Sequence, residues 1–181
     1  MKKIQTIFNR PESQKLVVPV PTEAYQLCVL SIPTLKRDGA AAMVLNGTLY
    51  RRRICPIDKV PPKGFVEVEV FGNKRYGWIL PDPTNPEDKY YLSIDAPKID
   101  GTYELIGPKV QGNAERELNR KFVLHGSEEL PTAPVPTGDV PRDFERLKTY
   151  FDLNHLEGIV YWKNGSPVGK IKRRDFGYRW P

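Results

Sequence analysis

Proline placement constrains the fold of this chain more than any other sequence feature. The 181 residues include 18 prolines, and these are spread through the connecting stretches between short apolar runs. Proline lacks the backbone N–H that a helix interior or a central strand requires. The distribution therefore argues against a helical bundle and favours a loop-rich α+β domain.

Length and composition indicate a single folded domain. A chain of 181 residues can bury a real core, whereas a second full domain is not expected at this length. A hydrophobic content of 39% and an aromatic content of 10% suit a globular protein. We therefore expect one domain that spans residues 1–181.

The charge balance is basic. Twenty-eight Lys and Arg against 22 Asp and Glu give a net charge of +6 and a pI of about 9.3. Such a balance favours polyanionic partners, either nucleic acid or nucleotide phosphates. Many small soluble proteins are equally basic without such a partner, so charge alone leaves both interpretations open.

Cysteine and histidine are sparse. Cys28 and Cys55 do not form a CxxC pair, and His125 and His155 are the only histidines. These counts argue against a zinc site and against a disulfide framework. The N-terminus has no apolar signal region, and no stretch approaches membrane-spanning length. We expect a soluble, cytoplasmic protein without membrane contacts.

Asn46-Gly47 is the strongest local signal, because both residues of a tight hairpin turn take positive φ. It lies between two extended runs, residues 40–45 and 48–53. The hairpin would fold Tyr50-Arg51-Arg52-Arg53 back beside the strand that ends at Lys36, where an arginine could meet a bound phosphate. The alternative is a solvated basic edge strand. Alternation puts Arg51 and Arg53 on one face and Arg52 on the other.

Periodicity predicts the remaining elements. A short helix follows Thr22, and a longer helix begins at Asp139 with an apolar stripe at 144, 147 and 151. Strict alternation over 65–70 places Glu67 and Glu69 on one strand face, most simply in water. Further strands are expected at residues 29–32, 77–80, 90–94, 102–107, 121–125, 157–162 and 168–172.

Four charged residues stand out in these strands. Glu104 is a carboxylate in an otherwise apolar run, which is costly unless it is paired or faces a ligand. Lys170 and Lys172 share one strand face, about 7 Å apart, which suits a phosphate clamp; edge lysines are also common without a function. Glu157 lies across the same hairpin, where it could hold a metal ion or pair with a lysine.

The order of these segments along the chain is the basis of a family resemblance. K-R-D-G at Lys36 is followed by arginines, Y-E-L-I-G-P at Glu104, E-G-I-V-Y-W at Glu157 and G-K-I-K at the paired lysines. In this order the chain resembles the covalent nucleotidyltransferases, the superfamily of polynucleotide ligases and mRNA capping enzymes. It is most similar to the small ATP-dependent 5′–3′ RNA ligases of the vertebrate type. That likeness rests on residues 104–107, 112–113, 156–162 and 170–181, which end in Gly-x-x-Trp-Pro.

The resemblance implies a fold and a reaction. The fold would be an ATP-grasp-like nucleotidyltransferase fold of antiparallel sheets flanked by a few helices. Lys36 would attack the α-phosphate of ATP and form a lysyl-AMP intermediate. AMP would pass to an RNA 5′-phosphate, and a 3′-hydroxyl would then displace it and join the two ends. ATP and Mg²⁺ (or Mn²⁺) would be the cofactors.

The resemblance also assigns nucleotide-binding roles. Glu104 would bind the AMP ribose, and Phe122 is the candidate for stacking on adenine. Asp38 would orient the lysine loop, and Gly39 would let the backbone approach the nucleotide. Glu157 would be the carboxylate nearest the metal ion.

The cations have a catalytic rationale. A lysine nucleophile must be neutral when it attacks, whereas its ordinary pKa is about 10.4. Neighbouring cations and desolvation lower that pKa. Lys170, Lys172 and the arginines at 51–53 would supply those cations and hold the α-phosphate, and the sequence does not fix which of Arg51, Arg52 and Arg53 contacts the nucleotide.

One departure from the family keeps other functions open. Most of these enzymes carry an OB-fold or helical domain beyond the last lysine motif, and here nine residues follow Lys172. A protein partner could replace that domain, and the sequence does not show whether one does. The alternatives to RNA ligation are guanylylation of an RNA end, AMP transfer to a protein, or a basic RNA-binding domain without catalysis.

Overall fold

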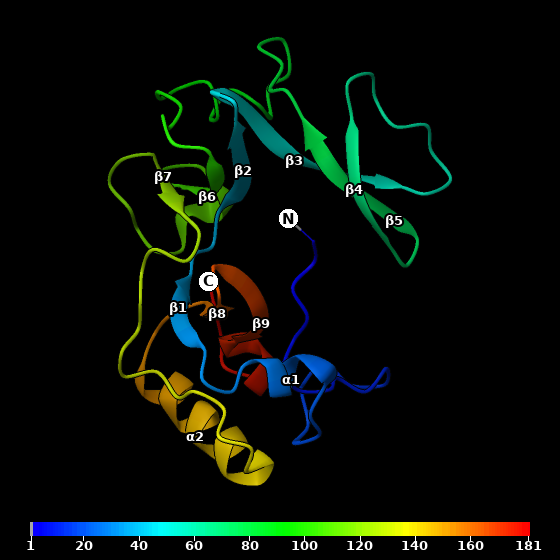
Figure 1. Ribbon diagram of the computed structural model, residues 1–181. Coiled ribbons are helices and arrows are strands. Elements are labelled where there is room, and N and C mark those ends of the chain that lie inside the picture. The colour runs from blue at the N-terminus through cyan, green and yellow to red at the C-terminus, as the bar shows by residue number, and fades with distance from the viewer. Residues whose placement is uncertain (1) are drawn as a thin grey trace. The chain divides into compact units, whose positions relative to one another are not determined.

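The computed structural model describes residues 2–181, and this part of the chain forms two compact units (Figure 1). The six-stranded unit comprises residues 38–125 together with Lys2 and Lys3. The three-stranded unit comprises residues 4–37 and 126–181. Each unit has its own antiparallel sheet. The expectation of an α+β protein is confirmed, whereas the more specific nucleotidyltransferase fold stays a prediction.

The six-stranded unit is built on one antiparallel sheet. Its sheet has the order β4-β5-β3-β2-β6-β7, and every neighbouring pair is antiparallel. One 3₁₀ turn, η1 (Gln111–Asn113), follows β6. The strands are β2 (Ala40–Leu45), β3 (Thr48–Pro56), β4 (Val66–Phe71), β5 (Lys74–Ile79), β6 (Gly101–Ile106) and β7 (Lys121–Leu124).

The predicted Asn-Gly hairpin is confirmed. Asn46 and Gly47 join β2 to β3 with φ values of 51° and 71°, the left-handed conformations that such a turn requires. The Asp100 carboxylate accepts from both turn N–H groups, at 2.7 Å for Asn46 and 3.3 Å for Gly47. The local turn chemistry therefore fixes the β2–β3 register.

Two strand predictions for this unit are wrong. A β-bulge in β4 places Glu67 opposite Gly77 but Glu69 opposite Tyr76, so the two carboxylates point to opposite faces. Residues 90–94 form turns, not a strand, because their backbone bonds are local; the Tyr91 N–H donates to the Asp88 carbonyl at 3.0 Å. The apolar character of residues 90–94 is explained by packing, because the Tyr91 ring is buried in the core of this unit.

The strand pairings define two faces of this sheet, because directly opposed residues point to the same side. One face carries the core, with Ala42 and Val44 of β2 and Tyr103 and Leu105 of β6. Tyr91 and Val110 complete that cluster. The opposite face carries Glu104 and is called here the Glu104 face. Its members in the register are Ala41, Met43, Tyr50, Arg52, Trp78, Thr102 and Glu104.

The three-stranded unit contains both α-helices. Its sheet has the order β1-β8-β9, formed by β1 (Ile32–Lys36), β8 (Gly158–Lys163) and β9 (Ser166–Lys172). The helices are α1 (Glu23–Leu27) and α2 (Val140–Leu153), and the 3₁₀ helix η2 (Arg173–Phe176) follows β9. β1 begins at Ile32, later than predicted, because Leu30 takes a positive φ of 60° and residues 28–30 form a turn.

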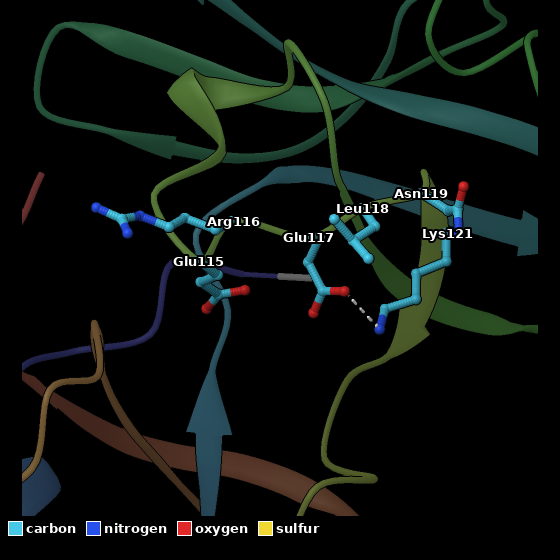
Figure 2. Close-up of a pocket in the computed structure, with 6 residues that line it drawn as sticks. All are labelled: Glu115, Arg116, Glu117, Leu118, Asn119 and Lys121. Atoms are coloured by element: carbon cyan, nitrogen blue, oxygen red, sulfur yellow. Dashed lines mark ion pairs between the residues drawn. The ribbon is translucent and has the colours of Figure 1, made fainter.

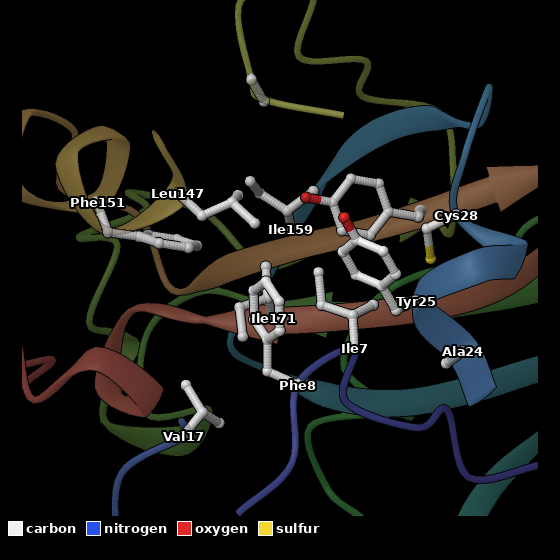
Figure 3. Packing of buried hydrophobic residues seen from close by; sticks show 12 residues of the cluster. Ile7, Phe8, Val17, Ala24, Tyr25, Cys28, Leu147, Phe151, Ile159 and Ile171 are labelled. Carbon is white, nitrogen blue, oxygen red and sulfur yellow. The ribbon is translucent and has the colours of Figure 1, made fainter. Parts of the chain in front are cut away.

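Helix α2 covers one side of this sheet with the predicted stripe. Asp139 caps the helix by accepting from the Arg142 N–H at 3.3 Å, and Pro141 lies in its first turn. Leu147 and Phe151 pack with Ile159 of β8 and Ile171 of β9, and all four side chains are fully buried (Figure 3). The N-terminal segment adds Ile7 and Phe8 to this core.

Among residues 2–181, no helix combines the length and the apolar character needed to cross a membrane.

The core position of Leu147 gives a stability prediction. Leu147→Ala should lower the free energy of unfolding by about 2–5 kcal/mol, because it removes buried methyl groups and leaves a cavity. Leu153→Ala is the matched control on the same helix, since Leu153 is 78% exposed and should cost at most about 0.5 kcal/mol. Urea denaturation followed by circular dichroism measures both. Equal losses in the two variants would contradict the packing described for α2.

Candidate active site

Two lysines and one carboxylate form a cluster in the three-stranded unit. Lys36, the last residue of β1, is opposite Gly158 of β8, and Gly158 is opposite Lys172 of β9. The three residues therefore form a row across the sheet, and the two lysines flank a residue with no side chain. The neighbouring row, with Ile159 and Ile171, points to the core. The predicted alternation of Lys170, Ile171 and Lys172 is thus confirmed.

Glu157 joins the two lysines. Its Oε1 accepts from the Lys172 Nζ at 2.9 Å, and its Oε2 accepts from the Lys36 Nζ. The side chain of Glu157 is only 6% exposed, whereas those of Lys36 and Lys172 are 22% and 16% exposed. Both lysine side chains are therefore partly exposed while they share one buried carboxylate.

The sequence explains why these residues meet. Glu157 immediately precedes β8, and its carbonyl accepts from the Arg173 N–H at 2.9 Å, which continues the β8–β9 pairing. At position 158 an added Cβ would lie 3.2 Å from the Lys172 Cα and closer still to the Ile171 carbonyl oxygen. Glycine is therefore required at the centre of the row.

The electrostatics of the cluster lower the pKa of Lys172. Burial lowers the pKa of Lys172, the charge of Lys36 lowers it further, and the hydrogen-bonded Glu157 carboxylate partly opposes both effects. Two ammonium groups and one carboxylate carry a net charge of +1. Loss of one proton leaves a neutral cluster that contains one neutral amine, which is the form that can act as a nucleophile.

Glu157 does not fit the predicted role of a metal ligand in this arrangement. Both of its oxygens accept from ammonium groups, so a divalent cation would have to displace a lysine. Within residues 2–181, no three His, Cys, Asp or Glu side chains form a metal-binding group. Mg²⁺ is often held by one or two carboxylates together with substrate phosphates. The predicted Mg²⁺ therefore stays a proposal in which the nucleotide supplies most of the ligands.

A second polar cluster lies on the Glu104 face of the six-stranded unit. The Glu104 Oε1 accepts from the Gly39 N–H at 3.1 Å, and its Oε2 lies 2.8 Å from the His125 Nε2. The His125 Nδ1 lies 3.0 Å from the Thr102 Oγ1. The cost of a carboxylate in an apolar strand is thus offset by two hydrogen-bond partners.

The Gly39 contact depends on the absence of a side chain. An added Cβ at this position would lie 2.9 Å from the Glu104 Cγ and 2.8 Å from the Ile106 Cγ2. Gly39 is the third residue after Lys36 along the chain, and Asp38 between them begins the six-stranded unit. The backbone of Gly39 therefore lies close to Glu104, and its predicted approach to a nucleotide stays a prediction.

The three consecutive arginines divide between the two faces. Arg51 is on the core face, where its Nε lies 2.5 Å from the Oδ1 of the fully buried Asp88, an ion pair without hydrogen-bond geometry. Arg53 pairs with Glu87 at 3.5 Å. Arg52 is the one arginine of the three on the Glu104 face.

Arg52 has an environment of its own. Its guanidinium carbon lies 5.3 Å from the centre of the Tyr76 ring and 5.9 Å from that of Trp78. Burial lowers the pKa of Arg52, whereas the charges of Glu69 and Glu104 raise it. This placement favours Arg52, not Arg51 or Arg53, as the arginine available to a ligand on that face.

The placement of Phe122 favours a packing role over the predicted contact with adenine. It is opposite Leu105 in the β6–β7 register and so lies on the core face. Its ring packs against the core cluster, with an edge-to-face contact to Tyr103 at a centroid distance of 6.4 Å. A bound nucleotide on the Glu104 face would not meet this ring.

A surface pocket in the β6–β7 connection holds none of the predicted site residues. Glu117 and Lys121 form an ion pair of 2.9 Å across it (Figure 2). The lining residues are Glu115, Arg116, Glu117, Leu118, Asn119 and Lys121. A pocket lined by paired surface charges offers no group that the proposed chemistry requires.

The structure thus brings some predicted residues together and adds two. Lys36, Glu157 and Lys172 meet, with Lys170 two residues along the same strand face. Glu104 and Gly39 meet in the other unit. His125 and Thr102 are site residues that the sequence reasoning missed. The available signal was that His125 ends the expected strand that follows, along the chain, the strand carrying Glu104.

Comparisons with known proteins do not assign the chain to a family. No family model matches the sequence, and no curated protein matches it.

The cluster predicts how the Lys172 pKa responds to its neighbours. In the wild type it should lie below the ordinary value of about 10.4. Lys36→Ala should raise it by removing a like charge, whereas Glu157→Gln should lower it further by removing the opposite charge. NMR titration of the lysine Cε and Nζ signals, with Lys172 assigned through Lys172→Arg, measures these shifts. The exposed Lys148→Ala should leave the value unchanged, and shifts of the opposite sign would contradict the cluster.

The arginine run predicts two different mutational effects. Arg51→Ala should cost about 3–5 kcal/mol of unfolding free energy, because it leaves the Asp88 carboxylate buried without its partner. Arg52→Ala should cost about 1 kcal/mol, the scale of its cation–π contacts. Chemical denaturation of both variants measures the difference. A larger loss for Arg52→Ala than for Arg51→Ala would contradict the two-face assignment.

Proposed function

We propose that the chain is an ATP-dependent RNA ligase that joins 5′-phosphate and 3′-hydroxyl ends through a lysyl-AMP intermediate. The observation that carries the proposal is the pair of partly exposed lysines, Lys36 and Lys172, that share the buried Glu157 carboxylate. A nucleophilic amine, a second cation and a proton acceptor are the groups that covalent adenylation requires. The order of sequence motifs supports the same activity.

Lys36 is the proposed nucleophile. As an ammonium group it donates to Glu157, so the carboxylate that holds it can also receive its proton. The neutral Nζ then attacks the α-phosphorus of ATP, a P–N bond forms, and the bond to the pyrophosphate oxygen breaks. Pyrophosphate leaves with the electron pair of that bond, and the attacking nitrogen releases its second proton to solvent.

Lys172 is the proposed electrostatic stabiliser. Once Glu157 holds the proton from Lys36, Lys172 is the remaining ammonium group of the cluster, with its Nζ 2.9 Å from the Glu157 Oε1. It can interact with the α-phosphate oxygens, whose negative charge must be stabilised in an in-line displacement. The second cation of the pair predicted from sequence, Lys170, lies two residues away on the same strand face and is proposed to contact phosphate oxygens as well.

The later steps use the same chemistry. The RNA 5′-phosphate attacks lysyl-AMP, the P–N bond breaks, and the Lys36 amine is regenerated. The 3′-hydroxyl of the second RNA end then attacks the activated 5′-phosphorus and releases AMP. The net charge of +6 is consistent with binding to an RNA backbone, with electrostatic contacts that weaken as salt is added. Recognition of the ribose by Glu104 is the role that the family resemblance implies.

The proposal predicts a covalent adduct that depends on Lys36. Incubation with α-labelled ATP and Mg²⁺, followed by denaturing electrophoresis, should label the wild type. Lys36→Arg should give no label, because arginine keeps the charge of the cluster but stays protonated. Lys172→Ala should slow labelling by about 10²–10³-fold. Lys148→Ala, an exposed lysine on α2, should label like the wild type. Equal labelling of Lys36→Arg would remove Lys36 from the reaction.

The same assay separates the alternatives. A label from α-labelled GTP in place of ATP would favour guanylylation of RNA ends. An ATP label that 5′-phosphorylated RNA discharges, with joined or circular product, supports ligation. A label that passes to a second protein supports AMP transfer to protein. The absence of label with either nucleotide, together with retained RNA binding, would leave a non-catalytic RNA-binding domain.

A further inference from the structure

The Glu104 cluster contains a histidine that the proposed reaction does not yet use. The backbone N–H of His125 donates to the Thr102 carbonyl at 2.9 Å, which extends the β6–β7 pairing and fixes the position of the ring. Its two ring nitrogens then bridge Thr102 and Glu104, at 3.0 Å and 2.8 Å. The ring therefore links two residues of β6 that lie on one sheet face.

The chemistry of the partners sets the protonation of the ring. An ionised carboxylate only accepts hydrogen bonds, so the Nε2 that faces Glu104 carries a proton. The Thr102 hydroxyl can donate to a neutral Nδ1 or accept from a protonated one. His125 is consequently a donor to Glu104 in either charge state, with Thr102 holding the ring in that orientation.

The carboxylate retains capacity for a ligand. A carboxylate has about four acceptor positions, and Gly39 and His125 use one on each oxygen. The Glu104 side chain is 14% exposed, so its remaining positions are not fully closed off from solvent. Two acceptor positions on one fixed carboxylate match the two adjacent hydroxyls of a ribose.

We infer that His125, held by Thr102, positions the Glu104 carboxylate to accept hydrogen bonds from the ribose hydroxyls of the nucleotide. The inference rests on the proposed function for the identity of the ligand. It assigns His125 as a positioning residue: the ring contacts Glu104, and Glu104 contacts the ribose. The selectivity of the protein for ribonucleotides over deoxynucleotides therefore depends on a side chain that does not touch the sugar.

The test is nucleotide selectivity, which a merely structural histidine would not change. Isothermal titration calorimetry of the full chain carrying Lys36→Arg, which cannot form the adduct, compares ATP with 2′-deoxy-ATP and 3′-deoxy-ATP. With His125 intact, we expect ATP to bind about ten- to a hundredfold more tightly than the weaker deoxynucleotide, the range for a hydrogen bond to a charged group. In His125→Ala on this background, the preference should fall to about threefold or less.

A matched pair of amides separates the two contacts of the ring. The amide of His125→Gln can reach the position of Nε2 and should restore part of the ribose preference. The shorter amide of His125→Asn matches Nδ1 and should not. Combining His125→Ala with Glu104→Gln should reduce the preference no further than Glu104→Gln alone, because both changes act through one carboxylate. Unfolding midpoints of all variants verify that the compared proteins are folded, and the amide pair decides the matter should His125→Ala not fold.

The outcomes distinguish this inference from the proposed function. Full ribose preference in His125→Ala or in His125→Asn overturns the positioning role, even when the wild type forms the ATP adduct. An ATP preference that depends on His125 supports the role, even when the wild type forms no adduct and the ligase proposal fails. Absence of ATP binding by the intact chain overturns both.

Discussion

The Glu157 carboxylate is the interaction on which the proposed chemistry depends. Burying a carboxylate costs several kcal/mol unless charged partners compensate for the lost hydration. Here two lysines, from opposite edges of the three-stranded sheet, provide that compensation. The same contacts place two cations about one proton acceptor. The pairing that makes Glu157 tolerable in the interior is therefore also the arrangement that a lysine nucleophile requires.

The geometry of the sheet explains why this arrangement needs glycine at its centre. A side chain at position 158 would lie in the row between Lys36 and Lys172, and it would also collide with the β9 backbone. In the sequence pair Glu157-Gly158, the glutamate thus forms ion pairs with both lysines, and the glycine leaves the space between them free of a side chain. Neither residue alone would produce the cluster. The dipeptide Glu-Gly therefore predicts such a cluster only when both residues are present and only at the start of the central strand.

Local signals sufficed to predict much of the fold. Asn46-Gly47 and the Asp139 cap act within a few residues, and the structure has both the hairpin and the helix they indicate. The errors arose where long-range pairing overrides local pattern. The bulge in β4 separates Glu67 from Glu69, and the Tyr90–Ile94 run buries an aromatic ring from a series of turns. A periodic pattern cannot reveal an inserted residue in a ladder, because the insertion is defined by the partner strand.

The same limit governed the site residues. Alternation separated Arg52 from Arg51 and Arg53, but only the β3-β2-β6 register shows that Arg52 shares a face with Glu104. The β6–β7 register places Phe122 on the core face, and His125, the residue after β7, contacts Glu104. Assigning side chains to a common face across three strands requires the registers of two strand pairs. A shift of either register by one residue moves the side chains of a strand to the opposite face. The residues proposed to bind the ligand are consequently the ones least determined by their own sequence neighbours, and His125 is the clearest case. Its proposed role follows from the strand opposite it, not from any pattern around it.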